Sequence, residues 1–139
     1  MRTRYANMKD LNYLIKHDNH IKKQTIRKKI KLKEYILYEL EKKIIGFMRF
    51  GFIWSAIPYI EIIKVDEEFR KRGFAKEMVN FLEKIAKKNK QKFILSSSTG
   101  NEKEPQNWHK KIGFKEIGKL KQINYPSKVP EVFFIKKIK

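Results

Sequence analysis

The spacing of hydrophobic residues changes along the chain, and each change predicts a different kind of element. The segments 8–17 and 19–33 carry apolar residues about one helical turn apart, so both read as helices. Asp18 or Asn19 could cap the second helix. From residue 34 the period shortens, and EYILYEL, KIIGFMRFGFI and PYIEIIKV follow, separated by charged or turn-like breaks. These segments predict three consecutive strands joined by hairpins.

The helical period returns at Phe74 and lasts to Lys88. KFILSSS then reads as a short buried strand, and EPQNWHKKI as a short helix that ends at Gly113. FKEIGKL and EVFFIKKI predict two closing strands, and TRYAN predicts a short first one. The order predicts a mixed α/β (α+β) fold with a largely antiparallel sheet. Residues 57–98 form a strand–helix–strand unit, which should be a right-handed parallel crossover.

Composition limits the class of protein. The chain has 139 residues, which suits a single domain over 1–139, and 41% of its residues are hydrophobic, enough for a core. It contains no cysteine, which excludes thiolate chemistry, and its three histidines lack the neighbours of a metal cluster, so we expect no metal. No apolar run approaches the ~20 residues of a membrane span. We therefore expect a cytoplasmic protein without a membrane partner.

The net charge of +19 favours anionic partners. Nucleic acid, an anionic membrane and a polyphosphate ligand all satisfy that preference, and so does a surface of solvated lysines that bind nothing. Five of the basic residues (Lys22, Lys23, Arg27, Lys28 and Lys29) fall outside the apolar stripe of the second predicted helix. If that helix flanks a binding cleft, its charge favours an acidic acceptor or a target associated with nucleic acid.

The segment DEEFRKRGFAKE lies between the predicted strand that ends at Val65 and the long predicted helix. The first turn of a helix presents unpaired N–H groups and the positive end of its dipole. Gly73 allows close backbone approach, and Arg70, Lys71, Arg72 and Lys76 add positive charge around it. These features bind phosphate oxygens, although a helix start with solvated basic residues is the simpler alternative.

The same segment resembles the acyl-CoA pyrophosphate loop of the GNAT superfamily of N-acyltransferases, whose pattern is Arg/Gln-x-x-Gly-x-Gly/Ala. Arg70, Gly73 and Ala75 match the pattern, and WHKKIGF at 108–114 is similar to a second family signature, Leu-Tyr-x-Lys-x-Gly-Phe. The resemblance covers essentially the whole chain. It implies helices on both faces of the sheet and a splayed pair of parallel strands, as in small bacterial members of the family.

The resemblance also implies acetyl-CoA as co-substrate. By analogy, the main chain at Ile63, Lys64 and Val65 pairs with the pantetheine arm, and the main chain from Lys71 to Lys76 holds the pyrophosphate. The implied cofactor-binding residues are Ile63, Lys64, Val65, Arg70, Lys71, Arg72, Gly73, Phe74, Ala75, Lys76, Asn101, Trp108 and Lys111. The family's pantetheine-binding asparagine falls at Glu102 by count, with Asn101 beside it.

Two residues are candidates for catalysis by direct attack of an amine on the thioester. Glu61 is a lone carboxylate in an apolar strand, where burial would raise its pKa and suit a general base. A surface position or an ion pair with Arg49 is the alternative. His109 occupies the slot of the tyrosine that acts as acid in the family. It either donates a proton or hydrogen bonds to the sulfur, or it is a helix-surface histidine that contacts CoA.

Trp54, Tyr59 and Ser97 are the candidate acceptor-binding residues, since the aromatic pair lies near a predicted hairpin and Ser97 supplies a hydroxyl. Core packing and a dimer contact are alternatives for the aromatic pair. The expected partner is a small-molecule or protein amine, with the chain a monomer or a homodimer whose last strand could pair across the interface. A nucleic-acid-binding module without catalysis and an acyl-CoA-binding protein without acceptor activity are the competing readings. Nucleic acid is possible but not favoured.

Overall fold

The computed structural model describes residues 2–139. The elements follow the predicted order, with two additional 3-10 turns. They are β1 (Arg2–Tyr5), η1 (Met8–Asp10), α1 (Leu11–His17), α2 (Lys23–Lys31), β2 (Tyr35–Leu40), β3 (Lys43–Ile53), β4 (Ile57–Val65), η2 (Glu67–Phe69), α3 (Phe74–Lys88), β5 (Phe93–Thr99), α4 (Lys103–Lys111), β6 (Lys115–Leu120) and β7 (Glu131–Lys137). No helix within residues 2–139 is long and apolar enough to cross a membrane.

Hydrogen bonds join the strands into a seven-stranded sheet in the order β1-β2-β3-β4-β5-β7-β6. β4 and β5 pair in parallel, whereas β1–β2, β2–β3, β5–β7 and β6–β7 are antiparallel, which confirms the predicted mixed sheet and its parallel pair. The chain divides into two compact units: an N-terminal unit (Met1–Gly51 with Ile62–Phe81) and a C-terminal unit (Phe52–Glu61 with Leu82–Lys139). β3, β4 and α3 contribute residues to both units.

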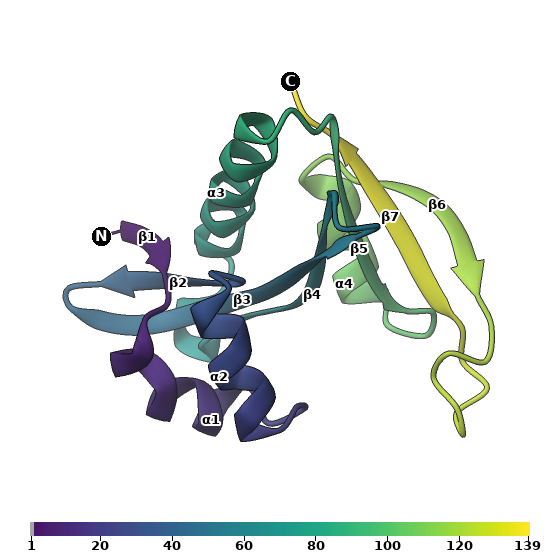
Figure 1. Ribbon diagram of the computed structural model, residues 1–139. Coiled ribbons are helices and arrows are strands. Elements are labelled where there is room, and N and C mark those ends of the chain that lie inside the picture. The colour runs from purple at the N-terminus through teal and green to yellow at the C-terminus, as the bar shows by residue number, and fades with distance from the viewer. Residues whose placement is uncertain (1) are drawn as a thin grey trace. The chain divides into compact units, whose positions relative to one another are not determined.

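In the N-terminal unit, α1 and α2 lie on one face of the β2–β3 hairpin and the start of α3 lies on the other (Figure 1). The face that α1 and α2 cover contains a cluster of buried apolar residues: Ala6, Leu14, Ile26, Ile30, Tyr35, Leu37 and Phe47. On the other face, a Cβ at Gly46 would lie 2.8 Å from the Lys64 carbonyl oxygen and 3.3 Å from the Met78 methyl. Glycine at this position therefore allows α3 and β4 to approach β3 closely.

The second helix is shorter than predicted, and its predicted cap is wrong. α2 begins at Lys23 with Lys22 at the N-cap position, whereas Asp18 ends α1. The Asp18 side chain is fully buried and accepts hydrogen bonds from Tyr35 Oη at 2.6 Å and from Arg49 Nη1 at 2.9 Å. Asp18 is committed to these long-range partners in β2 and β3, so it cannot cap a helix that follows it in sequence.

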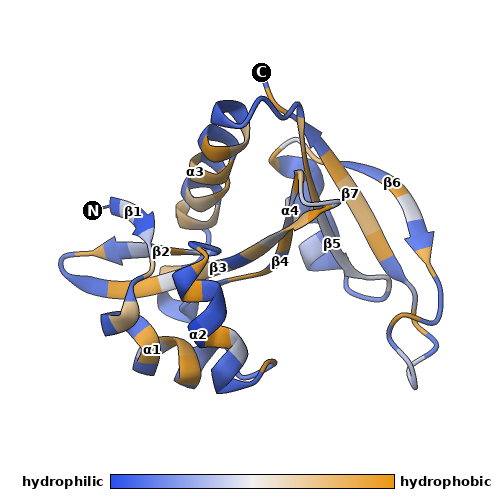
Figure 2. Cartoon of the chain, viewed as in Figure 1, coloured by the Kyte–Doolittle hydropathy of each residue, from blue (hydrophilic) through white to orange (hydrophobic). Residues whose placement is uncertain are grey.

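In the C-terminal unit, β5 lies between β4 and β7, and β7 lies between β5 and β6. The prediction that the last strand could pair across a dimer is wrong, because both edges of β7 are already paired. Figure 2 shows hydrophobic colour through the middle of β7. Side chains alternate between the two faces of β5. Ile94, Ser96 and Ser98 are buried on one face, and Leu95, Ser97 and Thr99 are half-buried on the other.

His109 of α4 packs on the first of these faces and is only 4% exposed. Its ring stacks on Phe134 of β7 with the centroids 4.4 Å apart and the planes at 2°. The Pro105 carbonyl oxygen lies 2.7 Å from Nδ1 and can only accept, so Nδ1 carries the proton. Nε2 then accepts from the Ser96 hydroxyl at 2.7 Å. Burial lowers the His109 pKa, against smaller opposing effects of the Pro105 hydrogen bond and of Glu131, so the ring is neutral.

A partly buried ion pair holds the first strand of the N-terminal unit in place. Arg4 of β1 donates two hydrogen bonds to Asp10, at 2.9 and 3.0 Å, and Asp10 also accepts from the backbone N–H of Asn7. Asp10 is 6% exposed. Burial opposes ionisation of this carboxyl, but the bonds from Arg4 and Asn7 outweigh it and lower the pKa of Asp10.

We expect Asp10→Asn to lower the free energy of unfolding by about 2 kcal/mol at pH 7, because the neutral Asn amide cannot form an ion pair with the Arg4 guanidinium. The ordinary pKa of Asp is 3.8, and the folded value lies below it. The stabilisation by ionised Asp10 is therefore fully present above pH 3.8 and is lost as the pH falls through the pKa that Asp10 has in the folded protein. Urea unfolding at pH 7 and pH 3 should show the gap between wild type and variant closing. An equal gap at both pH values would contradict this account, and Glu41→Gln on the exposed β2–β3 turn is the control.

His109 should also make stability fall in mild acid, at a higher pH than Asp10 does. The unfolded chain takes up a proton near the ordinary pKa of 6.5, and the folded chain does so only at a lower pH, so stability falls as the pH drops through 6.5. We expect His109→Gln to lose about 2 kcal/mol at pH 7.5, from lost stacking and hydrogen bonding, and to lose this pH dependence as well. Urea midpoints at pH 7.5 and 5.5 measure both effects. Asn107→Ala, on an exposed side chain of α4, should keep the wild-type dependence; if it removes it, His109 is not the source.

Candidate active site

The connection from β4 to α3 has a backbone shaped for close approach of a ligand. Val65 ends the strand, η2 follows, and Lys71 and Gly73 both adopt left-handed conformations, with φ of 62° and 86°. A Cβ built at Gly73 would meet no heavy atom within 4 Å. The backbone angle, and not crowding, thus favours glycine here, and open space lies beside it.

The helix that follows starts where the sequence predicted, at Phe74. Its first backbone bond runs from the Glu77 N–H to the Gly73 carbonyl oxygen at 3.0 Å. The N–H groups of Phe74, Ala75 and Lys76 therefore belong to the first turn, which has no acceptors within the helix. Because α3 is 15 residues long, its dipole adds partial positive charge at this end.

The basic side chains of this loop are exposed, and two of them are held in place. Arg70 donates from Nε to the Val65 carbonyl oxygen at 2.9 Å, which folds the side chain back onto the end of β4. The Arg72 guanidinium lies 5.7 Å from the Phe69 ring centroid and 5.2 Å from that of Phe74. Such cation–π contacts orient a guanidinium without neutralising it. The loop can therefore present positive charge and backbone donors together to an anion.

A cavity of about 780 Å³ lies in the N-terminal unit beside the end of β4. Its walls come from α1, β3, the end of β4 and the η2 segment, and they include Lys64, Val65 and Arg70. This volume falls in the usual range for small-molecule sites. Three of the implied cofactor-binding residues thus line one hollow, and Ile63 and the residues from Lys71 to Lys76 belong to the same unit.

The other candidate residues belong to the C-terminal unit: Trp54, Tyr59, Glu61, Ser97, Asn101, Trp108, His109 and Lys111. Tyr59 and Ser97 meet, with their hydroxyl oxygens 2.7 Å apart. Ser97 donates to Glu131 Oε2 at 2.6 Å, and Asn124 Nδ2 donates to Glu131 Oε1 at 3.1 Å. The Tyr59 ring also stacks on Phe133, 6.0 Å between centroids.

Glu61 is exposed, so the burial that was expected to suit it for general-base catalysis is wrong. It still lies close enough to Tyr59 to act on it electrostatically. Burial raises the pKa of Tyr59, and the Ser97 hydrogen bond opposes this increase, while the charges of Glu131 and Glu61 add to it. Tyr59 is therefore a neutral phenol with two carboxylates near it.

The structure also corrects two alternatives for the aromatic and histidine candidates. His109 is not a helix-surface histidine, because it is buried with both ring nitrogens bonded inside its own unit. Those bonds do not favour it as a direct proton donor, and that role stays a prediction. Trp54 is 87% exposed on the β3–β4 turn, which excludes core packing, whereas Tyr59 is half-buried.

Asn101, Lys111 and Glu102 are exposed, and Trp108 is half-buried. Glu102 takes the N-cap position of α4, and Asn101 lies in the turn before it. The sequence interpretation missed Glu131, which contacts Ser97 through the pairing of β5 with β7. A lone carboxylate at the start of an apolar strand was its only local signal, since 34 residues separate it from Ser97.

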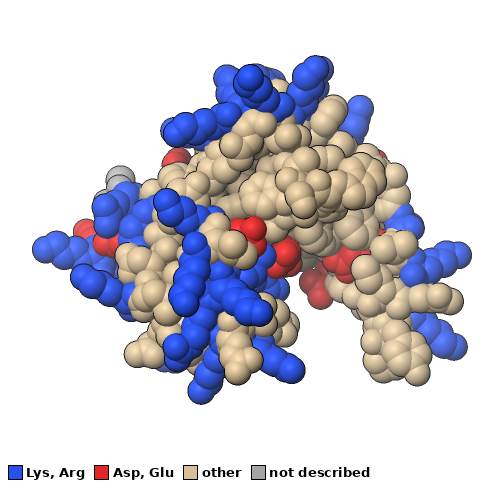
Figure 3. Space-filling view, in the orientation of Figure 1, with Lys and Arg blue, Asp and Glu red and all other residues tan. Residues whose placement is uncertain are grey.

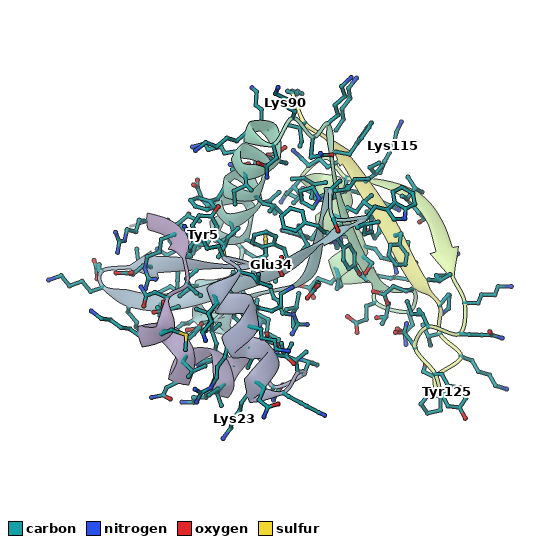
Figure 4. The ribbon with its side chains drawn as sticks, viewed as in Figure 1. Tyr5, Lys23, Glu34, Lys90, Lys115 and Tyr125 are labelled. Atoms are coloured by element: carbon teal, nitrogen blue, oxygen red, sulfur yellow. The ribbon has the colours of Figure 1, made fainter. Side chains whose placement is uncertain are left out.

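The outer face of α2 forms a basic surface in the N-terminal unit. Ile26 and Ile30 are buried beneath it, and its exposed basic residues are Lys22, Lys23, Arg27, Lys28 and Lys31. Lys29 instead pairs with Glu34 at 2.9 Å. Figure 3 shows Lys and Arg gathered over this helix, and Figure 4 shows Lys23 pointing away from the strands. Within residues 2–139, no group of His, Asp and Glu could hold a metal ion.

Comparison with known proteins identifies the family of this arrangement. Residues 6–114 match the Acetyltransferase (GNAT) family. Among curated protein sequences, none gives a significant match. The family match includes β4, the Gly73 loop, α3, β5 and His109, which together carry most of the candidate residues.

Solved structures agree over nearly the full length. Ribosomal-protein-alanine N-acetyltransferase from Brucella melitensis has a TM-score of 0.83 at 16% identity, with 99% of each chain covered. Ard1 from Thermoplasma volcanium has a TM-score of 0.85 at 14% identity, covering 99% of this chain and 97% of that one. yncA from Salmonella typhimurium, solved with its cofactor acetyl-CoA, has a TM-score of 0.82 at 12% identity, covering 100% and 94%. Such low identities establish the fold alone, whereas the family match extends over most of the sequence, and the chain therefore belongs to the GNAT family of acetyltransferases.

Proposed function

We propose that the protein transfers the acetyl group of acetyl-CoA to a primary amine of a small-molecule or protein acceptor by direct attack. The observation that carries the proposal is the Gly73 loop, which combines a left-handed glycine, open space and exposed basic side chains at the start of a 15-residue helix. Family membership supplies the reaction class.

The loop fits a pyrophosphate in several respects. The N–H groups of the first turn of α3 can donate to phosphate oxygens, and the helix dipole favours their negative charge. A side chain at position 73 would occupy the open space beside the loop. Arg70, Arg72 and Lys76 would add charge at the margin. We assign the main chain at Ile63, Lys64 and Val65 to the pantetheine arm on the basis of the family resemblance.

Acetyl-CoA, when bound, supplies the thioester carbonyl carbon that the amine attacks. The chain must then bind the amine in its neutral form and take up the proton that it loses. Glu61 remains a candidate base, acting through water because its side chain is exposed. We assign His109 the role of holding Ser96 and α4 in place, with direct proton donation as the less favoured alternative.

The nature of the acceptor is proposed from the class of relatives. Similar structures include enzymes named for ribosomal-protein alanine and for an aminoglycoside, which present protein and small-molecule amines respectively. We propose an acceptor of one of these two kinds. Nucleic-acid binding through the basic face of α2 remains the competing interpretation of the protein's net positive charge.

Gly73→Glu tests the cofactor assignment. The glutamate would fill the open space and repel the pyrophosphate, so we expect calorimetric titration to show acetyl-CoA binding by wild type and at least about a 100-fold weaker Kd in the variant. The left-handed angle should also cost about 1–2 kcal/mol of stability, which urea unfolding measures separately.

Gly118→Glu is the matched control, because Gly118 also has no heavy atom within 4 Å of a built Cβ and lies in β6 of the C-terminal unit. It adds the same charge and should leave the Kd unchanged. Absence of binding by wild type at moderate salt would overturn the proposal. Equal Kd values for Gly73→Glu and wild type would move the pyrophosphate away from this loop.

A further inference from the structure

Three side chains in the C-terminal unit form a hydrogen-bonded chain with a fixed direction. Ser97 has one hydroxyl proton, and it donates that proton to Glu131 Oε2 at 2.6 Å. The hydrogen bond between Ser97 and Tyr59, at 2.7 Å, must therefore use the Tyr59 proton. Protons point in sequence from Tyr59 to Ser97 to Glu131, and the carboxylate ends the chain.

The two ends of this chain have different properties. At one end, Asn124 Nδ2 donates to the second oxygen of Glu131 and holds the carboxylate in place. At the other end, the Tyr59 oxygen donates its own proton and keeps lone pairs that can accept one. Tyr59 is half-buried, so part of the residue is exposed to solvent, and its ring is held against Phe133.

An unsatisfied polar group lies beside the chain. Thr99 is directly opposite Glu131 in the β5–β7 register and shares a face of the sheet with Ser97. Its Oγ1 is buried and has no hydrogen-bond partner among the described residues. Because this oxygen is buried, it is closed to a ligand and takes no part in the chain from Tyr59 to Glu131.

We propose that Tyr59, Ser97 and Glu131 form a proton relay that takes the proton from the acceptor amine, with Glu131 as the terminal base. The inference rests on the proposed acetyl transfer. As the amine nitrogen forms its bond to the thioester carbon, its proton passes to the Tyr59 oxygen. The Tyr59 proton passes to Ser97, and the Ser97 proton to Glu131. The carbon–sulfur bond breaks, the electron pair leaves on sulfur, which takes a proton from water, and Glu131 later returns its proton to solvent.

This relay differs from catalysis by Glu61. Glu61 is exposed and its charge raises the pKa of Tyr59, whereas Glu131 is joined to Tyr59 through Ser97 by two hydrogen bonds of 2.6 and 2.7 Å. Both carboxylates favour a positively charged group near Tyr59, which suits an amine as it acquires charge during attack. Glu131 acts through two hydroxyl groups and need not touch the acceptor.

Steady-state kinetics of wild type, Tyr59→Phe, Glu131→Gln and the double variant test the relay. Free-thiol release would be followed with acetyl-CoA and three probes: a peptide beginning with alanine, an N-blocked lysine peptide and kanamycin. Each single variant should lower kcat about 100-fold with little change in KM. Phenylalanine removes the hydroxyl that receives the amine proton, and glutamine keeps the Ser97 hydrogen bond but cannot take a proton. The double variant should be no slower than either single variant, within about threefold, since both changes break one chain.

Glu131→Asp, which keeps a carboxylate, should recover part of the rate, and Glu116→Gln, on an exposed residue of β6, should match wild type. A wild-type kcat in Glu131→Gln would overturn the relay, and so would losses that multiply in the double variant. No turnover of any probe by wild type, with acetyl-CoA binding intact, would overturn it as well. If wild type does not bind acetyl-CoA, the proposed function fails as well. Measuring acetyl-CoA binding therefore distinguishes failure of the relay from failure of the proposed function.

Discussion

The pairing of β5 on both of its edges determines what each of its consecutive serines contacts. Side chains alternate across a strand, so Ser96 faces α4 and Ser97 faces the opposite side of the sheet. β7 supplies Phe134 to the first side, where His109 stacks on it, and Glu131 to the second. A shift of one residue in this register would exchange the two sets of partners and dismantle both.

Local patterns in the sequence carried much of the fold. α3 was predicted at its observed bounds because its apolar stripe is regular and a glycine precedes it. The failure at Asp18 has a physical cause: an aspartate between two helices is a plausible cap, but Arg49, 31 residues away, and Tyr35 bind it instead. Periodicity reports which residues are buried, whereas the destination of a buried charge depends on strands that arrive later in the chain.

The same distinction separates the Gly73 loop from the contact between Ser97 and Glu131. The Gly73 loop was predictable because its angle, its charges and its helix dipole come from about ten consecutive residues. The role of Glu131 was not predictable, because its contact with Ser97 needs the strand order β5-β7-β6. In this order β7, the last strand of the chain, lies between β5 and β6. Burial of His109 was equally hidden, since it depends on the Phe134 ring across the sheet.

The contacts of Arg72 with Phe69 and Phe74 affect how much side-chain entropy the loop would lose when it binds an anion. A free arginine side chain loses up to about 2 kcal/mol of rotational freedom when it is immobilised. Here part of that loss occurs as the chain folds, because the two rings already restrict the guanidinium. The loop is therefore preorganised, and an anion that binds there would need to order fewer rotatable bonds than it would in a loop of unrestrained basic side chains.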